Sequence, residues 1–236
     1  MLQIHRDYVK AGSQAIITNT LTMNRLYVDT HAVDIDVERV NRAGAKLAIE
    51  AIGSDGYVLG NLSSTGQLLD PYGTYLEDEF IDTFKEQATY LAEGGVAGFI
   101  IETIIDLREA VCAVRACKAV STLPVIACIS YFSRSDGGRT AMGNSATDCA
   151  RVLTDEGADA IGANCGSIDP EQMAEIASIL QKNAKVSLNR TLANRDWWEA
   201  ARYLIWSQRA LPKGSSSVVI QARGYWVDVA EHRPST

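Results

Sequence analysis

The sequence predicts an α/β fold of the (β/α)8 TIM-type barrel class, in an incomplete form. From residue 4 to about residue 182 one unit recurs: a helical pattern, a glycine turn, a short apolar run and a polar phrase. Such apolar runs are typical of strands buried on both faces, and their alternation with helices predicts a parallel sheet. Five strands are recognisable, so a smaller open sheet is the alternative. The regular count favours the barrel, and no glycine-rich phosphate loop follows the first strand.

The predicted strands lie between helix-stop and helix-start signals. Glycines such as Gly95 and Gly157 come just ahead of apolar runs, where helices commonly end. Asp106 to Glu109 forms a capping-box pattern, and Ser145 with Asp148 plays a similar part before the next helix. The five predicted strands span residues 15–19, 57–62, 98–102, 124–130 and 159–164.

Composition restricts the functions that the chain can have. With 236 residues, 47% of them hydrophobic and 22% charged, we expect a soluble globular chain with one domain by length. A net charge of -7 gives no support for nucleic acid or an acidic membrane as a partner. No apolar run approaches the length of a bilayer span, and the N-terminus lacks the apolar core of a signal peptide. We therefore expect a cytoplasmic protein.

The cysteines and tryptophans are unevenly distributed. The spacing of the five cysteines fits no disulfide framework, which indicates reduced thiols in a cytoplasm. Cys112 and Cys117 fall inside a helical pattern and are interpreted as core or surface thiols. All four tryptophans lie in about the last forty residues, after every cysteine, so the chain changes character near Lys185.

One cysteine, Cys165, stands where a predicted strand ends and the next helix has not begun. Small apolar residues precede Asn164, and Asp169 with Pro170 then marks a helix start. In α/β folds this end of the strands carries the chemistry. Two interpretations stay open: a small buried hydrophobe, or a thiolate that serves as metal ligand or nucleophile.

Polar phrases also end the other predicted strands, at residues 18–20, 60–66, 102–103 and 130–131. Taken alone, most of them are typical of solvated loops. Glu102 is the exception, because a carboxylate directly after Gly-Phe-Ile-Ile is costly in a core and requires a cationic partner. That partner is either a substrate ammonium group or a neighbouring Lys or Arg, and the sequence leaves both open.

Residues 5 to about 180 resemble the homocysteine S-methyltransferase family, the barrel domain of betaine- and folate-dependent methionine-forming enzymes. The resemblance implies a (β/α)8 barrel of which strands two to six are present. It also implies zinc held by three cysteines, with the thiol of homocysteine in the remaining position. The phrases that carry it are IHRDYVKAGSQAIITNT, LSSTGQLLDPYGTY, IIETIIDLREA, DGGRTAMG and GANCG.

The resemblance also implies roles for individual residues. Zinc would remove the proton of the substrate thiol and leave a nucleophilic sulfur. Cys165 would ligate zinc, Glu102 would hold the substrate amino group and Asn164 would orient the site. Ser63 and Ser64 replace a Gly-Pro-like turn of the family, which alters the expected pocket shape. The remaining pocket-lining residues implied by the family are Thr18, Asn19 and Ser63.

Two larger departures from the family are evident. The family's first-strand phrase would precede His5, where only four residues stand, and the cysteine pair expected near the C-terminus is missing. Read in a shifted frame, the codons after Lys185 permit family phrases, including that cysteine pair. The sequence therefore predicts a partial homocysteine-binding barrel over residues 1–185 and a tail over residues 186–236 that is an out-of-frame remnant of the last strands.

The family implies zinc-dependent methyl transfer to homocysteine, giving methionine. With one of three zinc ligands present, we expect the chain as written to be inactive. The expected partners are homocysteine and a small methyl donor, together with a corrinoid- or folate-binding domain or protein. The sequence does not identify the donor. Two alternatives stay open: a corrinoid-linked methyltransferase for another thiol or amine, and a non-catalytic barrel fragment.

Overall fold

The framework of the protein is a curled sheet in which five neighbouring strands run parallel and follow the order of the chain. The computed structural model describes residues 1–11, 13–54, 56–132, 137–184 and 218–221. Its parallel strands are β1 (Ala15–Ile17), β2 (Tyr57–Leu62), β3 (Gly98–Ile104), β4 (Val125–Ile129) and β5 (Ala160–Asn164). A sixth strand, β6 (Val218–Gln221), pairs antiparallel with β5.

The five predicted parallel strands are confirmed, and the fold is an α/β half-barrel, an incomplete form of the predicted barrel. Two strand ends differ from the prediction by two residues, while β4 is one residue shorter at each end and β5 begins one residue later. β1 stops at Ile17 because the Thr18 hydroxyl, in place of a backbone carbonyl, takes the N–H of Asn61 at 2.9 Å. β3 runs on to Ile104 through an irregularity in its pairing with β4, where Thr103 has a φ of 60°.

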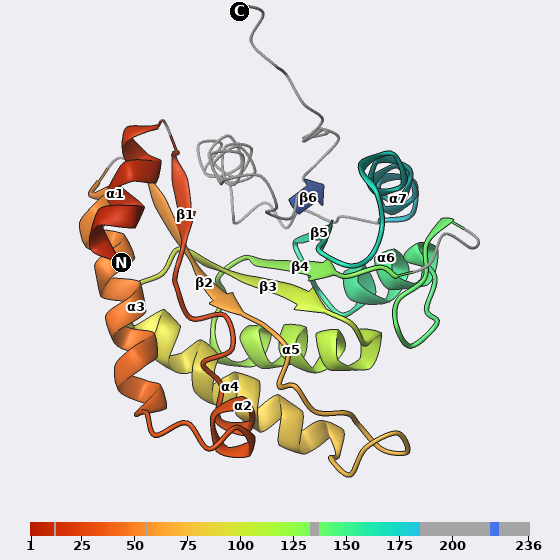
Figure 1. Ribbon diagram of the computed structural model, residues 1–236, viewed down its shortest axis with the longest axis horizontal. Helices are drawn as coiled ribbons and strands as arrows, with labels where there is room; N and C mark the ends of the chain where they lie inside the picture. The colour runs from red at the N-terminus through yellow and green to blue at the C-terminus, as the bar shows by residue number, and fades with distance from the viewer. Residues whose placement is uncertain (12, 55, 133–136, 185–217, 222–236) are drawn as a thin grey trace, which may run out of the picture.

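Seven described helices accompany the strands. Figure 1 shows them wrapped around the curled sheet: α1 and α3 beside β1, α4 and α5 beneath the middle strands, and α6 and α7 beside β5. Asp106, Ser145 and Asp169 cap helix starts, as predicted, and Asp36 does the same. The helices are α1 (Leu2–Lys10), α2 (Arg25–Thr30), α3 (Val37–Ile52), α4 (Glu77–Glu93), α5 (Leu107–Val120), α6 (Ala146–Asp155) and α7 (Pro170–Asn183). Within the described residues, no helix has the length and apolar character of a membrane span.

The main hydrophobic core lies between the sheet and these helices. Alternation along β3 sends Phe99 and Ile101 into this core, together with Phe80 and Phe84 of α4. The rings of Phe80 and Phe84 meet edge to face, with centroids 6.5 Å apart. Glu102 alternates with the core residues of β3 and so belongs to the other, inner face of the half-barrel. The strands therefore carry an apolar outer face and an inner face that becomes polar at their carboxyl ends.

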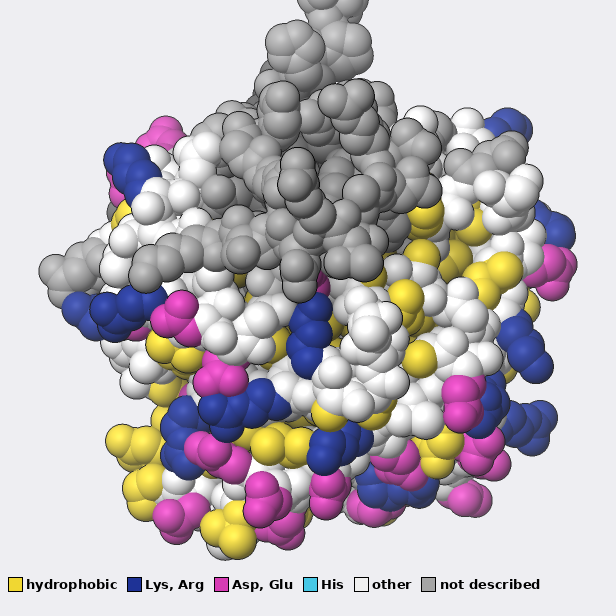
Figure 2. Space-filling view, turned by 180° about the vertical axis from the view of Figure 1, so that it is seen from behind, with side chains coloured by type: hydrophobic (Ala, Val, Ile, Leu, Met, Phe, Trp, Pro, Cys, Tyr) yellow, Lys and Arg dark blue, Asp and Glu magenta, His cyan; other side chains and the backbone are white. Residues whose placement is uncertain are grey.

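Ion pairs tie neighbouring helices together on the outer layer. Arg25 of α2 pairs with Glu86 of α4 at 2.7 Å, and Arg108 of α5 pairs with Glu77 of α4 at 2.9 Å. Figure 2 shows basic and acidic side chains interleaved on this helix-bearing side of the molecule. Such exposed pairs each contribute little to stability, so the apolar core provides most of the stability of the fold.

The predicted capping-box role of Glu109 is corrected by the structure. Asp106 does cap α5, by accepting from the Arg108 N–H at 2.9 Å. The Glu109 carboxylate instead accepts from the N–H of Thr65 at 2.7 Å and from the hydroxyls of Thr65 and Ser64. It thereby fixes the loop after β2 onto α5. Glu109 is only 2% exposed, and this burial, with a smaller effect of the Asp106 carboxylate, raises its pKa to about 7.

This raised pKa predicts a pH-dependent stability. Between about pH 4.5 and 7 the folded chain keeps the Glu109 proton, while the unfolded chain has lost it. The free energy of unfolding therefore falls by about 3 kcal/mol as pH rises through this window, and Glu109 adds no slope above it. We expect Glu109→Gln to remove this contribution in urea denaturation from pH 4 to 8. Glu156→Gln is the control, because Arg115 lowers the pKa of Glu156. Parallel curves for wild type and Glu109→Gln would contradict the prediction.

Candidate functional site

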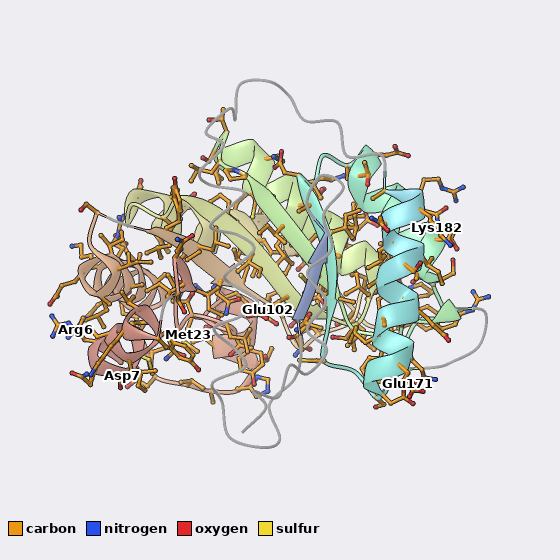
Figure 3. All side chains as sticks on the ribbon, turned by 90° about the horizontal axis from the view of Figure 1, so that it is seen from above. Arg6, Asp7, Met23, Glu102, Glu171 and Lys182 are labelled. Atoms are coloured by element: carbon orange, nitrogen blue, oxygen red, sulfur yellow. The ribbon has the colours of Figure 1, made fainter. Side chains whose placement is uncertain are left out.

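The carboxyl ends of the parallel strands gather polar side chains at one edge of the sheet. Because β1 to β5 are parallel and adjacent, the residues that end them lie side by side. Figure 3 shows Glu102 near the middle of the sheet, between the helices that lie to either side. The polar residues that are buried at this edge include Thr18, Thr20, Asn61, Ser63, Glu102, Ser130 and Asn164.

Glu102 is a buried carboxylate, 6% exposed, for which the described residues provide no ion pair. Its side chain accepts a hydrogen bond from Asn61, and the amide nitrogen of Asn164 lies 3.5 Å from its Oε2. Burial raises its pKa, and the bond from Asn61 only partly opposes that rise. Of the two partners that the sequence left open, a neighbouring Lys or Arg is not found in the described part of the chain.

Asn164 connects the ends of β3 and β5. Its Oδ1 accepts from the Thr103 N–H at 3.0 Å, and its Nδ2 donates to the Thr103 hydroxyl at 2.8 Å. The same nitrogen lies 3.3 Å from Sγ of Cys165. Thr103 and Cys165 both have a positive φ, 60° and 54°, which is uncommon and costly for residues with a side chain. One buried amide therefore holds two strained residues in place.

Cys165 differs from the other four cysteines in exposure. It is partly exposed, and its Sγ lies 3.6 Å from the Thr103 hydroxyl. The other four are buried. Burial raises the pKa of Cys112 and of Cys149 to about 12, and also raises the pKa of Cys117 and Cys128. The partial exposure of Cys165 therefore favours an accessible thiol over a small buried hydrophobe.

Three predicted pocket residues are placed differently from one another. The Thr18 hydroxyl is 2.6 Å from that of Thr20 and accepts a hydrogen bond from the Asn61 N–H, so it links the ends of β1 and β2. Asn19 is exposed, unlike its two buried neighbours. Ser63 is buried, and its hydroxyl donates to the Glu102 carbonyl at 2.7 Å. The structure therefore brings Glu102, Asn164 and Cys165 together, with Ser63 and Thr18 supporting the edge.

Sequence reasoning did not single out Asn61 or Thr103. Asn61 contacts the Glu102 carboxylate, and Thr103 bonds both Asn164 and Cys165. The signal for Asn61 was available: it alternates with the core residue Leu62 on β2 and so belongs to the inner face, as Glu102 does on β3. No comparable pattern marks Thr103, because its contacts depend on its unusual backbone conformation.

The residues do not fit a zinc ion held by three cysteines. All five cysteines of the sequence are described, and only Cys165 is a partly exposed thiol at the strand ends. Within the described ranges, no group of three His, Cys, Asp or Glu side chains is arranged to hold a metal. The predicted boundary at residue 185 and the predicted out-of-frame tail lie outside the described residues. Of that tail, only β6 is described.

Comparisons with known proteins show what the chain is similar to. The family model described as homocysteine S-methyltransferase matches residues 1–218, a range that extends past residue 185. Methionine synthase of Mycobacterium tuberculosis is 25% identical over 79% of the chain, and betaine–homocysteine S-methyltransferase 1 of Danio rerio is 30% identical over 69%. The matched segments are only 16% and 40% of those two proteins.

A solved structure shows the same fold. The metallated form of the homocysteine methyltransferase MmuM from Escherichia coli superimposes with a TM-score of 0.60. The superposition covers 85% of this chain and 76% of that one, at 18% sequence identity. Such low identity supports the fold and says nothing about individual site residues.

The turn that carries Cys165 predicts a sensitive glycine. Gly166 has a φ of 82°, and a Cβ added there would lie 2.0 Å from the Tyr131 carbonyl oxygen. Gly143 is a matched control, since its φ is 86° and a Cβ there would meet nothing within 4 Å. We expect Gly143→Ala to cost about 1 kcal/mol of stability from backbone strain alone. Gly166→Ala should cost about 3 kcal/mol or more, because a clash is added. Equal losses in chemical denaturation would contradict this account of the turn.

Proposed function

Because the chain belongs to the homocysteine S-methyltransferase family, we propose that its half-barrel binds homocysteine at the carboxyl ends of its strands. The activity implied by the family is transfer of a methyl group to the sulfur of homocysteine, which gives methionine. Since the chain spans well under half of the two curated relatives, their activities enter here as proposals. The observation that carries this one is the buried Glu102 carboxylate.

Glu102 suits the ammonium group of an amino acid. An ionised carboxylate in a buried site is costly unless a cation or several hydrogen bonds compensate it. Two amides contact Glu102, one of them at the long distance of 3.5 Å, and the described residues provide no ion pair. The ammonium of homocysteine would supply the missing positive charge together with N–H donors.

Cys165 and Asn164 suit the other end of the same substrate. One amide nitrogen, Nδ2 of Asn164, contacts both the Glu102 carboxylate and the Cys165 sulfur. The two groups therefore lie within the length of a small amino acid, so a ligand held by its ammonium at Glu102 places a short side chain near Cys165. Asn164 orients this end, because it fixes Thr103 as well as Cys165.

The activation of the substrate thiol is a separate requirement. A thiol at neutral pH is mostly protonated, and zinc in the family would provide the thiolate. A site with one accessible cysteine does not hold zinc in that manner, so we assign recognition of homocysteine to this chain and no step to a metal. Methyl transfer by the chain as it stands is accordingly proposed to be absent. Residues Glu102, Asn164 and Cys165 then act by binding and orienting the substrate.

Replacing Glu102 tests the proposed recognition. We expect Glu102→Gln to weaken homocysteine binding by at least tenfold in isothermal titration calorimetry, because a buried charged interaction is lost. Glu86→Gln, which removes a carboxylate from the surface pair with Arg25, is the control and should bind as the wild type does. If Glu102→Gln binds homocysteine with the same affinity as the wild type, the proposal is overturned.

Metal content is a second, independent test. A three-cysteine zinc site depends on all three thiolates, and this chain has one accessible thiol. We expect the purified chain to contain far less than one zinc per molecule by elemental analysis, with the same value for Cys165→Ser. Stoichiometric zinc in the wild type that disappears in Cys165→Ser would show that further ligands complete a site around Cys165.

A further inference from the structure

Asn61 carries an unused hydrogen-bond acceptor beside Glu102. Its side chain is buried, 3% exposed, and Oδ1 has no hydrogen-bond partner within the described ranges. The Glu102 carboxylate only accepts hydrogen bonds, so the bond between the two side chains comes from the amide nitrogen of Asn61. The carbonyl end of the same amide is therefore the free one. A buried acceptor without a donor is unfavourable, which points to a donor that the described residues do not supply.

The backbone of Asn61 is held firmly. Its N–H donates to the Thr18 hydroxyl at 2.9 Å, and its carbonyl accepts from the Thr20 hydroxyl at 2.8 Å. Nε2 of Gln87 lies 3.4 Å from the same carbonyl and 2.9 Å from the carbonyl of Thr20. These contacts from the segment after β1 and from α4 fix the end of β2. They position the Asn61 side chain on the inner face without using its Oδ1.

Asn61 and Glu102 together form an acceptor pair. In the parallel register Asn61 lies opposite Ile100, so Glu102 is its diagonal neighbour on the same face of the adjacent strand. A carboxylate and an amide oxygen suit a group that combines positive charge with several N–H donors. An ammonium group has three such donors and is the one part of homocysteine that offers both properties. A carboxylate offers neither property.

We propose that Asn61 is a second recognition residue for the substrate ammonium, with its Oδ1 accepting one N–H while Glu102 accepts another. This inference rests on the proposed function and adds to it. Asn61 makes the site selective for an amine-bearing thiol over a thiol of the same length without the amine. The selectivity follows from the unpaired acceptor, because a ligand without the amine leaves Oδ1 buried and unsatisfied.

The test compares two ligands across matched variants. The probes are homocysteine and 4-mercaptobutanoate, its analogue without the amine, in calorimetric titrations under reducing conditions at pH 8. We expect Asn61→Ala to weaken homocysteine binding about tenfold or more and to leave the affinity for 4-mercaptobutanoate within about twofold. Asn61→Asp keeps an acceptor oxygen at this position and should bind homocysteine more tightly than Asn61→Ala does.

Asn41→Ala is the control for a merely structural effect. Asn41 is also a fully buried amide, but its nitrogen donates to the carbonyls of Met23 and Val37 and its oxygen accepts from Gln87. We expect this variant to lower thermal stability and to leave the ratio of the two affinities unchanged. Thermal unfolding of each Asn61 variant establishes that it is folded before titration.

The outcomes separate the inference from the proposed function. If the wild type binds homocysteine and Glu102→Gln weakens it, but Asn61→Ala does not, only the role of Asn61 is overturned. Equal weakening of both ligands by Asn61→Ala also overturns it, since a structural loss has no preference for the amine. If the wild type does not bind homocysteine, the proposed function and this inference fail together.

Discussion

A buried carboxylate that pairs with no cation among the described residues determines the organisation of the strand ends. Glu102 lies on the inner face of β3, where burial disfavours its charged form. Amide groups approach it from both sides, Asn61 from β2 and Asn164 from β5. The backbone of Asn61 is held by the Thr18 and Thr20 hydroxyls, and the side-chain amide of Asn164 is held by Thr103. The polar edge is thus a network of fixed donors around one charge.

The parallel framework could be predicted from sequence to a large extent, because buried strands bounded by glycine turns leave a strong pattern. Cys165 and Glu102 could be predicted as candidate site residues for the same reason: a polar residue directly after an apolar run is conspicuous. The residues at which β1 and β3 end could not be predicted from the sequence. They depend on a side-chain bond from Thr18 and on the positive φ of Thr103, which no local pattern indicates for a β-branched residue.

Contacts between strands set the other limit. Asn61 meets Glu102 only through the register of β2 against β3, and register was not predicted. Glu109 shows a competition that local patterns miss, since a capping-box position matched its sequence while the loop after β2 provided buried donors. Buried N–H and hydroxyl groups need acceptors more than a helix start open to water does, so the tertiary contact prevails.

Among the described residues, those that contact the Glu102 side chain lie at the two ends of the stretch from Asn61 to Asn164. The successive parallel strands β2 to β5 span this stretch, although β2 already begins at Tyr57, and the helices between them lie within it. The proposed recognition of the amino group therefore depends on this one part of the chain, together with the Thr18 and Thr20 hydroxyls that hold the end of β2. Under this proposal, sequence changes after Cys165 leave the contacts of Glu102 with Asn61 and Asn164 in place, so binding of the amino group is separable from activation of the sulfur.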